Sequence, residues 1–176
     1  MTISIRLARP DEYERVAELT LAAYRALAVD HLWDDYDAEI ADTATRAKFA
    51  EVLVAVEGDE VLGSVTYVRD ADSPWREWTH GDEVQFRLLA VDPGAQGRGA
   101  GLALVRACLD RARADDRPIL IHSTPWMATA VHMYERFGFA RAPEHDVPYE
   151  EWYGDAKFTI PPEWVGQSFL AYSWTP

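Results

Sequence analysis

Four glycines stand close together in one short turn, and they are the most informative feature of the sequence. They lie at 94, 97, 99 and 101, between an apolar run that ends at Val91 and an amphipathic stretch that begins at Leu102. Glycine lets the backbone take positive φ and approach a ligand closely. A helix start leaves several N–H groups without partners and carries partial positive charge. The combination predicts an anion site built from backbone, of the kind that binds phosphate.

Two common phosphate loops do not fit this turn. A P-loop places Lys-Ser or Lys-Thr after its last glycine, whereas Leu102 and Ala103 follow Gly101. A dinucleotide-binding loop needs Gly-x-Gly-x-x-Gly, and Leu104 stands where its third glycine would be. A tight strand-to-helix turn without any ligand is the structural alternative.

The elements that position the turn follow from the spacing of apolar residues. Alternation predicts strands over 3–7, 52–56, 61–68, 83–91, 119–123 and 167–174. Helical spacing predicts helices from Pro10 to about Leu27, over 37–49, from Leu102 to about Ala114, and from Thr124 to Phe137 with Thr124 as N-cap. Since no repeat or linker interrupts this order, we expect a single domain over residues 1–176.

Composition excludes several classes of function. Of 176 residues 48% are apolar, and 17 Lys and Arg against 30 Asp and Glu give a net charge of −13. Because such a surface repels phosphate backbones and anionic lipids, we expect no nucleic-acid or membrane partner. The lone cysteine, Cys108, excludes an intrachain disulfide and a Cys-rich zinc site, and we expect no metal. Without a signal-peptide core or an apolar span, a cytoplasmic location is expected.

The glycine turn and a second stretch together resemble a known family. Gln96, Gly99 and Gly101 form Gln-x-x-Gly-x-Gly, and Tyr134 opens Tyr-Glu-Arg-Phe-Gly-Phe. Both stretches are similar to signatures of the GNAT acyltransferase superfamily, as is Arg-Leu-Ala-Arg-Pro-Asp at 6–11. The resemblance implies an α/β (α+β) single-domain fold with a twisted, mostly antiparallel sheet of about six to seven strands and about four flanking helices. In that fold a splayed strand pair holds the coenzyme.

The resemblance also implies acetyl-CoA as co-substrate and direct attack of a primary amine, from a small molecule or peptide, on its thioester. The expected coenzyme contacts are Leu89, Ala90, Val91, Gln96, Gly97, Arg98, Gly99, Ala100, Gly101, Leu102 and Tyr134. The Leu89 N–H would polarise the thioester carbonyl. Tyr134 would protonate the departing thiolate, because a phenol with a pKa of about 10 is protonated at neutral pH. Arg98 could equally be an exposed residue without a ligand, and Met127 replaces an asparagine that relatives often use.

The general base is not settled by the sequence. Many relatives carry a glutamate where this chain has Gln85, which leaves Glu83, His122 or a water. Alternation places Glu83 on the strand face of Gln85, Arg87 and Leu89. His122, on the facing strand, has a suitable reference pKa near 6.5. A solvated strand end for Glu83 and a hydrogen-bonded core residue for His122 are the alternatives.

The acceptor site is expected in the aromatic loops over 29–36, 72–82 and 143–162. The expected substrate contacts are Trp33, Tyr36, Gln85 and Trp152. Aromatic walls with carboxylates suit an amine, although the same aromatics could pack the loops down or form a dimer contact. Two functions therefore compete: an N-acetyltransferase, as a homodimer in many relatives, or a catalytically idle acyl-CoA-binding sensor.

Overall fold

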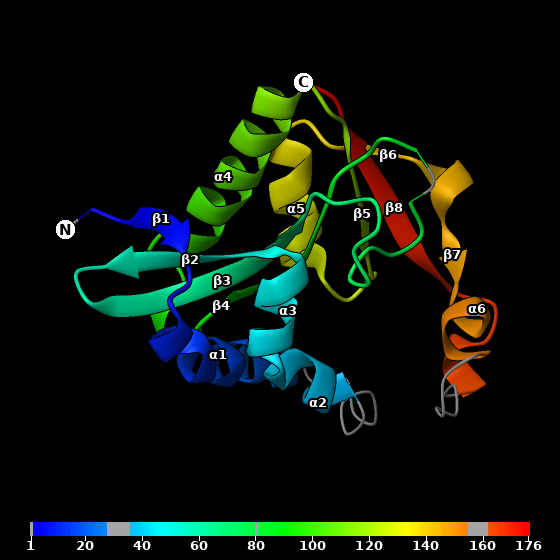
Figure 1. Cartoon of the computed structure of the whole chain (residues 1–176). Helices are drawn as coiled ribbons and strands as arrows, with labels where there is room; N and C mark the ends of the chain where they lie inside the picture. Colours follow the sequence, from blue (N-terminus) through cyan, green and yellow to red (C-terminus); the bar gives the residue numbers. More distant parts are fainter. Residues whose placement is uncertain (1, 28–35, 80, 155–161) are drawn as a thin grey trace.

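The computed structural model describes residues 2–27, 36–79, 81–154 and 162–176, with backbone alone at 152–154. Its strands are β1 (Ser4–Leu7), β2 (Glu51–Glu57), β3 (Glu60–Val68), β4 (Gln85–Val91), β5 (Ile119–Ser123), β6 (Ala140–Arg141), β7 (Val147–Pro148) and β8 (Ser168–Trp174). Its helices are α1 (Tyr13–Arg25), α2 (Tyr36–Ala41), α3 (Thr43–Phe49), α4 (Ala100–Asp115), α5 (Ala128–Arg136) and α6 (Tyr149–Gly154) (Figure 1).

The strands form two sheets that meet at one point. β1, β2, β3 and β4 lie in that order, each antiparallel to the next, and β8 pairs with β5, β6 and β7. A single parallel bridge joins Val84 to Ile119, where Val84 N donates to Pro118 O at 2.8 Å and Leu120 N donates to Val84 O at 3.0 Å. Beyond it β4 and β5 diverge (Figure 1). The predicted mixed fold with a splayed strand pair is confirmed.

Helices cover both faces of the first sheet. Val16 and Leu19 of α1 pack against Val52 and Val54, while α4 packs on the opposite face, where Leu53 is buried. Because successive strand residues point to opposite faces and both faces are covered, β2 reads as a continuous apolar run between its end glutamates. The sheet is therefore a rigid support for whatever β4 carries at its edge.

A bulge in β4 decides which residues reach that edge. Leu88 has φ of 51°, and the pairing with β3 skips from Arg87 to Ala90. Leu88 and Leu89 thus lie outside the paired positions of the ladder. A bulge of this kind inserts an extra residue and reverses the alternation of the faces.

The bulge overturns one prediction from alternation. Phe86 and Leu89 both pack into the core that α4 covers, whereas Leu88 packs with the cluster on the other face. Leu89 therefore does not share a face with Gln85, as strict alternation required. The physical reason is the left-handed conformation at Leu88, which turns the following peptide over.

Two helix predictions also need correction. The helix expected over 37–49 is two helices, because Asp42 interrupts it and its Oδ1 accepts from Thr45 N at 3.0 Å to cap α3. The helix expected from Thr124 begins only at Ala128. Before it, Met127 N donates to Thr124 O at 3.0 Å in a turn, and the Thr124 hydroxyl makes no capping bond.

Candidate active site

The glycine turn opens into a cleft between α1, β4, α4 and α5, which we call the glycine-loop cleft. Its volume is about 750 Å³. It is lined by Leu89, Ala90 and Val91 of β4, by Gln96, Gly97, Gly99, Ala100, Gly101 and Leu102, and by residues of α1 and α5. The structure thus brings together nearly all the residues predicted to contact the coenzyme.

The backbone of the turn presents N–H groups to this cleft. Gly97 and Gly99 have φ of 79° and 93°, which side chains disfavour. The first bond of α4 runs from Ala103 N to Gly99 O, so the N–H groups of Ala100, Gly101 and Leu102 have no helical partner. Their partial positive charge is the physical requirement for holding a diphosphate.

A close approach of ligand to Gly101 is also possible. A Cβ at this position would lie 3.5 Å from Val91 Cγ2 and 3.8 Å from Met133 Sδ. Because Val91 and Met133 line the cleft, this Cβ would become part of the cleft wall. The Asp92 carboxylate holds the preceding turn by accepting from Gly94 N at 2.8 Å and pairing with Arg15. The residues present fit a coenzyme diphosphate.

Arg136, rather than the predicted Arg98, is the arginine among the described residues that line the glycine-loop cleft. The Arg98 guanidinium pairs with Glu57 and, at 3.1 Å, with Glu60, and Arg98 is not among the lining residues. Arg136 of α5 is exposed, lines the cleft, and has no ion pair to any described residue. Sequence reasoning passed over Arg136, although it lies two residues after Tyr134 in the second signature.

A smaller hollow lies between the diverging strands β4 and β5, and we call it the inner cavity. Its volume is about 140 Å³. It shares Tyr24, Leu89, Trp126, Met127 and Ala130 with the glycine-loop cleft, so the two hollows meet beside Leu89. Its other lining residues include Tyr36, Glu77, Trp78, Gln85, Arg87, His122, Ser123, Thr124, Tyr134, Tyr149, Trp164 and Phe169.

Tyr134 lines the inner cavity from α5. Its side chain is 6% exposed and its ring lies 5.7 Å from the rings of both Phe86 and Phe139. Burial disfavours the phenolate and raises the pKa of Tyr134 well above its ordinary value. The hydroxyl therefore carries its proton at neutral pH.

His122 also lines the inner cavity, from the end of β5. Its Nε2 lies 2.9 Å from the carbonyl oxygen of His145, which can only accept, so Nε2 carries the proton of the neutral ring. Nδ1 is buried, keeps its lone pair and has no hydrogen-bond partner among the described residues. Desolvation by burial lowers the pKa of His122, which favours this neutral form.

The other predicted base lies elsewhere. The Glu83 carboxylate accepts from Gly81 N at 2.8 Å and lies 3.7 Å from Arg76, outside the lining of the inner cavity. Gln85 does line the cavity, and its buried amide bonds Glu77 N at 3.1 Å and Glu77 O at 3.0 Å. Gln85 thus fixes the position of Glu77.

Of the aromatic residues predicted to contact the substrate, Tyr36 is described with its side chain. Tyr36 lines the inner cavity and its hydroxyl accepts from Arg87 Nη2 at 3.3 Å. Trp33 lies outside the described residues, and so does the side chain of Trp152, whose backbone is in α6.

Glu77 is the cavity carboxylate that sequence reasoning missed. It forms a 2.7 Å ion pair with Arg87, which also lies 3.5 Å from Glu39. Burial raises the pKa of Glu77, while the charge of Arg87 works in the opposite direction. A partly buried carboxylate that lines the inner cavity and has a raised pKa has the character of a proton acceptor.

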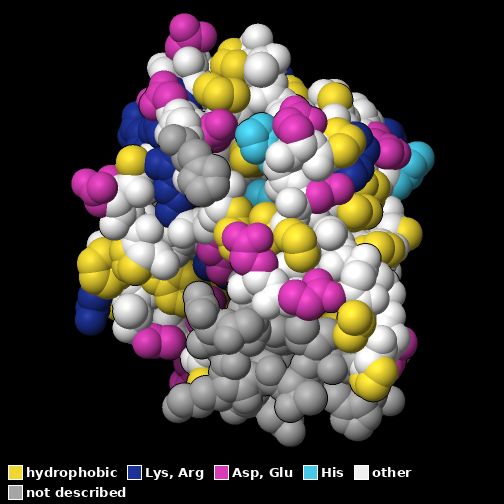
Figure 2. Space-filling model, turned by 90° about the vertical axis from the view of Figure 1, so that its right-hand side faces the viewer, with side chains coloured by type: hydrophobic (Ala, Val, Ile, Leu, Met, Phe, Trp, Pro, Cys, Tyr) yellow, Lys and Arg dark blue, Asp and Glu magenta, His cyan; other side chains and the backbone are white. Residues whose placement is uncertain are grey.

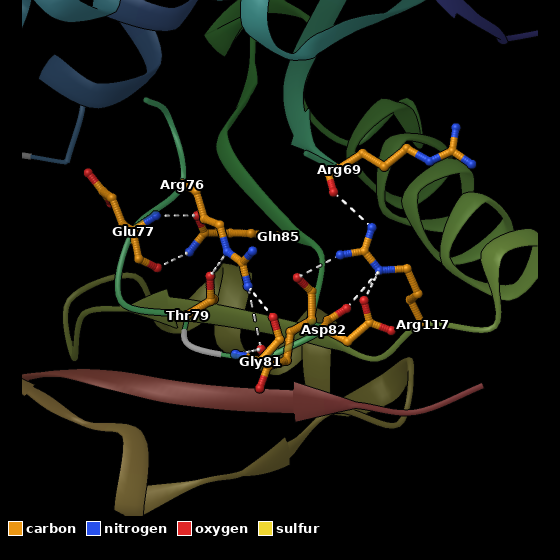
Figure 3. Close-up of polar contacts among 9 residues, drawn as sticks. Arg69, Arg76, Glu77, Thr79, Gly81, Asp82, Gln85 and Arg117 are labelled. Carbon is orange, nitrogen blue, oxygen red and sulfur yellow. Dashed lines mark hydrogen bonds and ion pairs between the residues drawn. The ribbon is translucent and has the colours of Figure 1, made fainter. Parts of the chain in front are cut away.

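Arginine contacts hold the loop that carries Glu77. Arg76 bonds Thr79 and, at 2.6 Å, Gly81 O; Arg117 bonds Asp82 O at 2.7 Å and Arg69 O at 2.8 Å (Figure 3). Because these bonds reach backbone oxygens on both sides of the loop, they fix its course across the start of β4.

The same loop places Trp78 against His122. Trp78 has φ of 50°, a conformation that a bulky residue adopts only when its surroundings require it. Its ring meets the His122 ring edge-on at 5.1 Å and lies 5.1 Å from the ring of Phe169. The indole thus closes the cavity toward β8.

On the face that carries β7 and α6, Asp and Glu side chains are spread among hydrophobic ones, in keeping with the net charge of −13 (Figure 2). In the part of the chain that the structure describes, no group of three His, Cys, Asp or Glu could hold a metal ion. No described helix has the length and apolar character needed to cross a bilayer.

A glycine turn at the start of α4 thus lies beside β4 and β5, which diverge beyond a parallel bridge. The model of the acetyltransferase (GNAT) family matches residues 13–139. The chain belongs to this family.

Individual relatives agree with this assignment. Mycothiol acetyltransferase from Cellulomonas flavigena is 35% identical over 94 residues, which are 52% of this chain and 27% of that protein. The match thus spans about a quarter of the relative's length.

Solved structures support the fold. A GNAT family acetyltransferase from Brucella melitensis, in complex with acetyl-CoA, is 26% identical with a TM-score of 0.58, covering 79% of this chain and 83% of that one. The yncA protein from Salmonella typhimurium, solved with acetyl-CoA, is 19% identical with a TM-score of 0.67, covering 99% and 94%.

Proposed function

We propose that this chain is a single-domain N-acetyltransferase that transfers an acetyl group from acetyl-CoA to a primary amine. The observation that carries the proposal is the meeting of the two hollows at Leu89. One hollow offers backbone N–H groups for a diphosphate, and the other is a small cavity lined by a carboxylate and a phenol. The acetyl-CoA complexes of the yncA protein and of the Brucella melitensis enzyme support the choice of co-substrate.

In this proposal the chain binds the coenzyme mainly through backbone. The N–H groups of Ala100, Gly101 and Leu102 hold the diphosphate, and Arg136 adds a cation to a phosphate. The edge of β4 from Leu89 to Val91 pairs with the extended pantetheine arm as a strand would. The bulge at Leu88 directs the Leu89 peptide toward the thioester carbonyl, where its N–H stabilises the developing oxyanion.

Protons move through two groups that line the inner cavity. The amine reaches the cavity as an ammonium ion, and Glu77 accepts one of its protons, since desolvation raises the pKa of that carboxyl. The amine nitrogen then forms a bond to the acyl carbon while the carbon–sulfur bond breaks. Tyr134 donates its proton to the departing thiolate. The second proton, which the nitrogen loses as it becomes an amide, returns to Tyr134. A thiolate formed in the same buried site is itself more basic than in water, which suits a donor whose pKa is raised.

His122 and Glu83 take positioning roles in this scheme. The His122 ring contacts the Trp78 ring edge-on, at the wall of the inner cavity. Glu83 fixes Gly81 of the loop that carries Glu77. Direct proton transfer by either residue is the competing version.

The test is steady-state thiol release from acetyl-CoA with a panel of primary amines, alongside calorimetry of acetyl-CoA binding. We expect saturable binding and amine-dependent thiol release. Tight binding without amine-dependent release would favour the idle acyl-CoA sensor, and no binding of any CoA species would remove both functions.

A further inference from the structure

Arg87 of β4 is the side chain at which α2 and the loop before β4 meet beside the inner cavity. Its guanidinium forms the 2.7 Å ion pair with Glu77 of the loop and lies 3.5 Å from Glu39 of α2. Nη2 also donates to the Tyr36 hydroxyl at 3.3 Å, and Nη1 donates to Trp75 O at 3.3 Å. One side chain thus connects two distant segments of the sequence that both contribute residues to the cavity lining.

Arg87 itself has little contact with solvent. Its side chain is 10% exposed, and its guanidinium carbon lies 5.5 Å from the centre of the Trp75 ring. A guanidinium held away from water needs a carboxylate beside it, and loss of that carboxylate is costly. The ion pair therefore ties the Glu77 side chain to β4, while the amide of Gln85 holds the Glu77 backbone.

Glu39 gives the same guanidinium a second carboxylate. Its side chain is 42% exposed, against 25% for Glu77, and it is not among the residues that line the inner cavity. If Glu77 were the sole partner, its protonation would leave Arg87 without an opposite charge. Because Glu39 is present, the guanidinium keeps a carboxylate partner when Glu77 takes a proton, so that step is less costly.

The two neighbours of Glu77 have opposite effects on its affinity for a proton. Desolvation raises the pKa of Glu77, the charge of Arg87 lowers it, and the charge of Glu39 raises it. The arginine alone would make Glu77 a weak base. The second carboxylate offsets part of that effect.

Other titratable groups surround the same region. The cavity is lined by four tyrosines, namely Tyr24, Tyr36, Tyr134 and Tyr149. Burial raises the pKa of each, so they carry no charge at neutral pH, and the lowered pKa of His122 keeps that ring neutral as well. Arg46 of α3 is a further cation, 5.8 Å from the centre of the Trp75 ring. Substitution of Arg87 or Glu39 leaves all these groups in place.

We infer that Arg87 is a positioning residue of the reaction, which holds Glu77 at the cavity wall, and that Glu39 balances the Arg87 charge so that Glu77 accepts a proton from the acceptor nitrogen. The inference rests on the proposed acetyl transfer and adds α2 to the elements that act in it.

Substitution of the two groups should move the titration of Glu77 in opposite directions. Arg87→Met removes the positive charge, so the acid limb of the kcat profile should move to higher pH by about one unit or more. Glu39→Gln removes the negative charge and should move the limb to lower pH by about half a unit, a smaller shift because Glu39 is more exposed. Arg87→Lys keeps the charge, so its limb should stay close to that of the wild type. A merely structural arginine predicts no such pair of opposite shifts.

Two measurements follow this titration. One is thiol release at saturating acetyl-CoA with the primary amine of the panel that gives the highest kcat. The other is the carboxyl carbon NMR resonance of Glu77 in isotope-labelled protein, assigned by its disappearance in Glu77→Gln, and it needs no amine. Arg111→Met and Glu51→Gln are matched controls, because they break a 2.8 Å ion pair outside both lining sets and should shift neither measurement.

The outcomes separate this inference from the proposed function. Opposite shifts in both measurements support it, and if Arg87→Met does not fold, the downward shift in Glu39→Gln decides. Amine-dependent turnover with an unmoved limb overturns the inference and leaves acetyl transfer standing, whether or not the Glu77 resonance shifts. If no amine raises thiol release although acetyl-CoA binds, the proposed transfer fails and the role of Arg87 fails with it.

Discussion

Tyr134 of α5 and Glu77 of the loop before β4 line the same small cavity, and we propose opposite roles for them, as proton donor and proton acceptor. Tyr134 is buried and Glu77 is partly buried, and the loss of solvation disfavours the charged form of each, so it raises both pKa values. For the phenol this keeps the proton in place until a stronger base appears. For the carboxylate it strengthens the affinity for a proton. One physical cause thus produces an acid and a base.

Removal of the phenolic hydroxyl tests the acid. Tyr134→Phe should lower kcat by about 100-fold or more, because proton donation by a positioned side chain contributes on that scale. The dissociation constant of acetyl-CoA should change less than about twofold, since the backbone of the glycine turn carries the charge recognition. Tyr67→Phe is the control: Tyr67 is another buried tyrosine with an unpaired hydroxyl, outside both lining sets. Equal turnover of the two variants would remove Tyr134 from the reaction.

The pH profile tests the base. A base must be ionised to work, so kcat should fall as pH drops through the raised pKa of Glu77. Glu77→Gln keeps the shape of the side chain, and it should lower kcat by about 100-fold and abolish this acid limb. Glu83→Gln should keep the limb. The reverse pattern in the two pH–rate profiles would identify Glu83 as the base.

At the scale of elements, two arginines at the ends of helices have different expected effects on ligands. Arg136 lies in the last turn of α5, on the glycine-loop cleft, and Arg98 precedes α4 and is neutralised by glutamates of the β2–β3 hairpin. Arg136→Ala should weaken acetyl-CoA binding by about five- to tenfold through loss of a phosphate contact. Arg98→Ala should leave affinity within about twofold. Calorimetry of both variants decides, and a larger loss in Arg98→Ala would contradict this placement.

Arg117 connects the end of α4 to the loop before β4. Its guanidinium donates to Asp82 O and Arg69 O, and it pairs with Asp82 at 3.1 Å. Arg117→Ala should lower the free energy of unfolding by about 1–2 kcal/mol and raise KM for the amine, because the loop also carries Glu77 and Trp78. Affinity for acetyl-CoA should not change. Arg106→Ala, at an exposed arginine of α4, is the control in urea unfolding and kinetics.

The elements also mark where sequence reasoning succeeded and where it failed. Glycines 97, 99 and 101 were found because a backbone that must take positive φ or approach a ligand shows itself as glycine. The bulge in β4 was not predicted, because the residue with positive φ is Leu88, and a leucine does not indicate that conformation in a sequence. Glu77 was missed because tertiary contacts of Arg76 and Arg117, rather than any local pattern, fix its loop. The predicted helix start at Thr124 was wrong because Thr124 begins a turn, closed by the bond from Met127 N to Thr124 O, before the helix.

At the scale of the whole molecule, acid stability depends on the N-terminal segment. Glu12 accepts from Arg6 Nη1 at 2.7 Å, Arg6 Nη2 at 2.6 Å and Arg9 N at 2.8 Å, and so joins β1 to the start of α1. The bonds from Arg6, followed by that from the Arg9 backbone, lower the pKa of Glu12 to about 2. A depressed pKa contributes stability above the usual value near 4.5, and this is lost as pH falls toward 2.

Glu12→Gln should therefore lower the free energy of unfolding by about 2 kcal/mol at pH 7 and have a much smaller effect near pH 2. Asp11→Asn, at the neighbouring exposed carboxylate, should have little effect at either pH. Urea unfolding at several pH values measures both. A deficit in Glu12→Gln that did not shrink on acidification would contradict the role of this carboxylate.

The single bridge between Val84 and Ile119 has a consequence for aggregation. Unpaired strand edges usually invite other chains to pair, and natural proteins shield them. Among the described strands, β4 and β5 turn such edges toward each other across a narrowing gap rather than toward solvent. An arm that pairs with the edge of β4, as proposed for pantetheine, would occupy the backbone groups through which another strand could otherwise join the sheet.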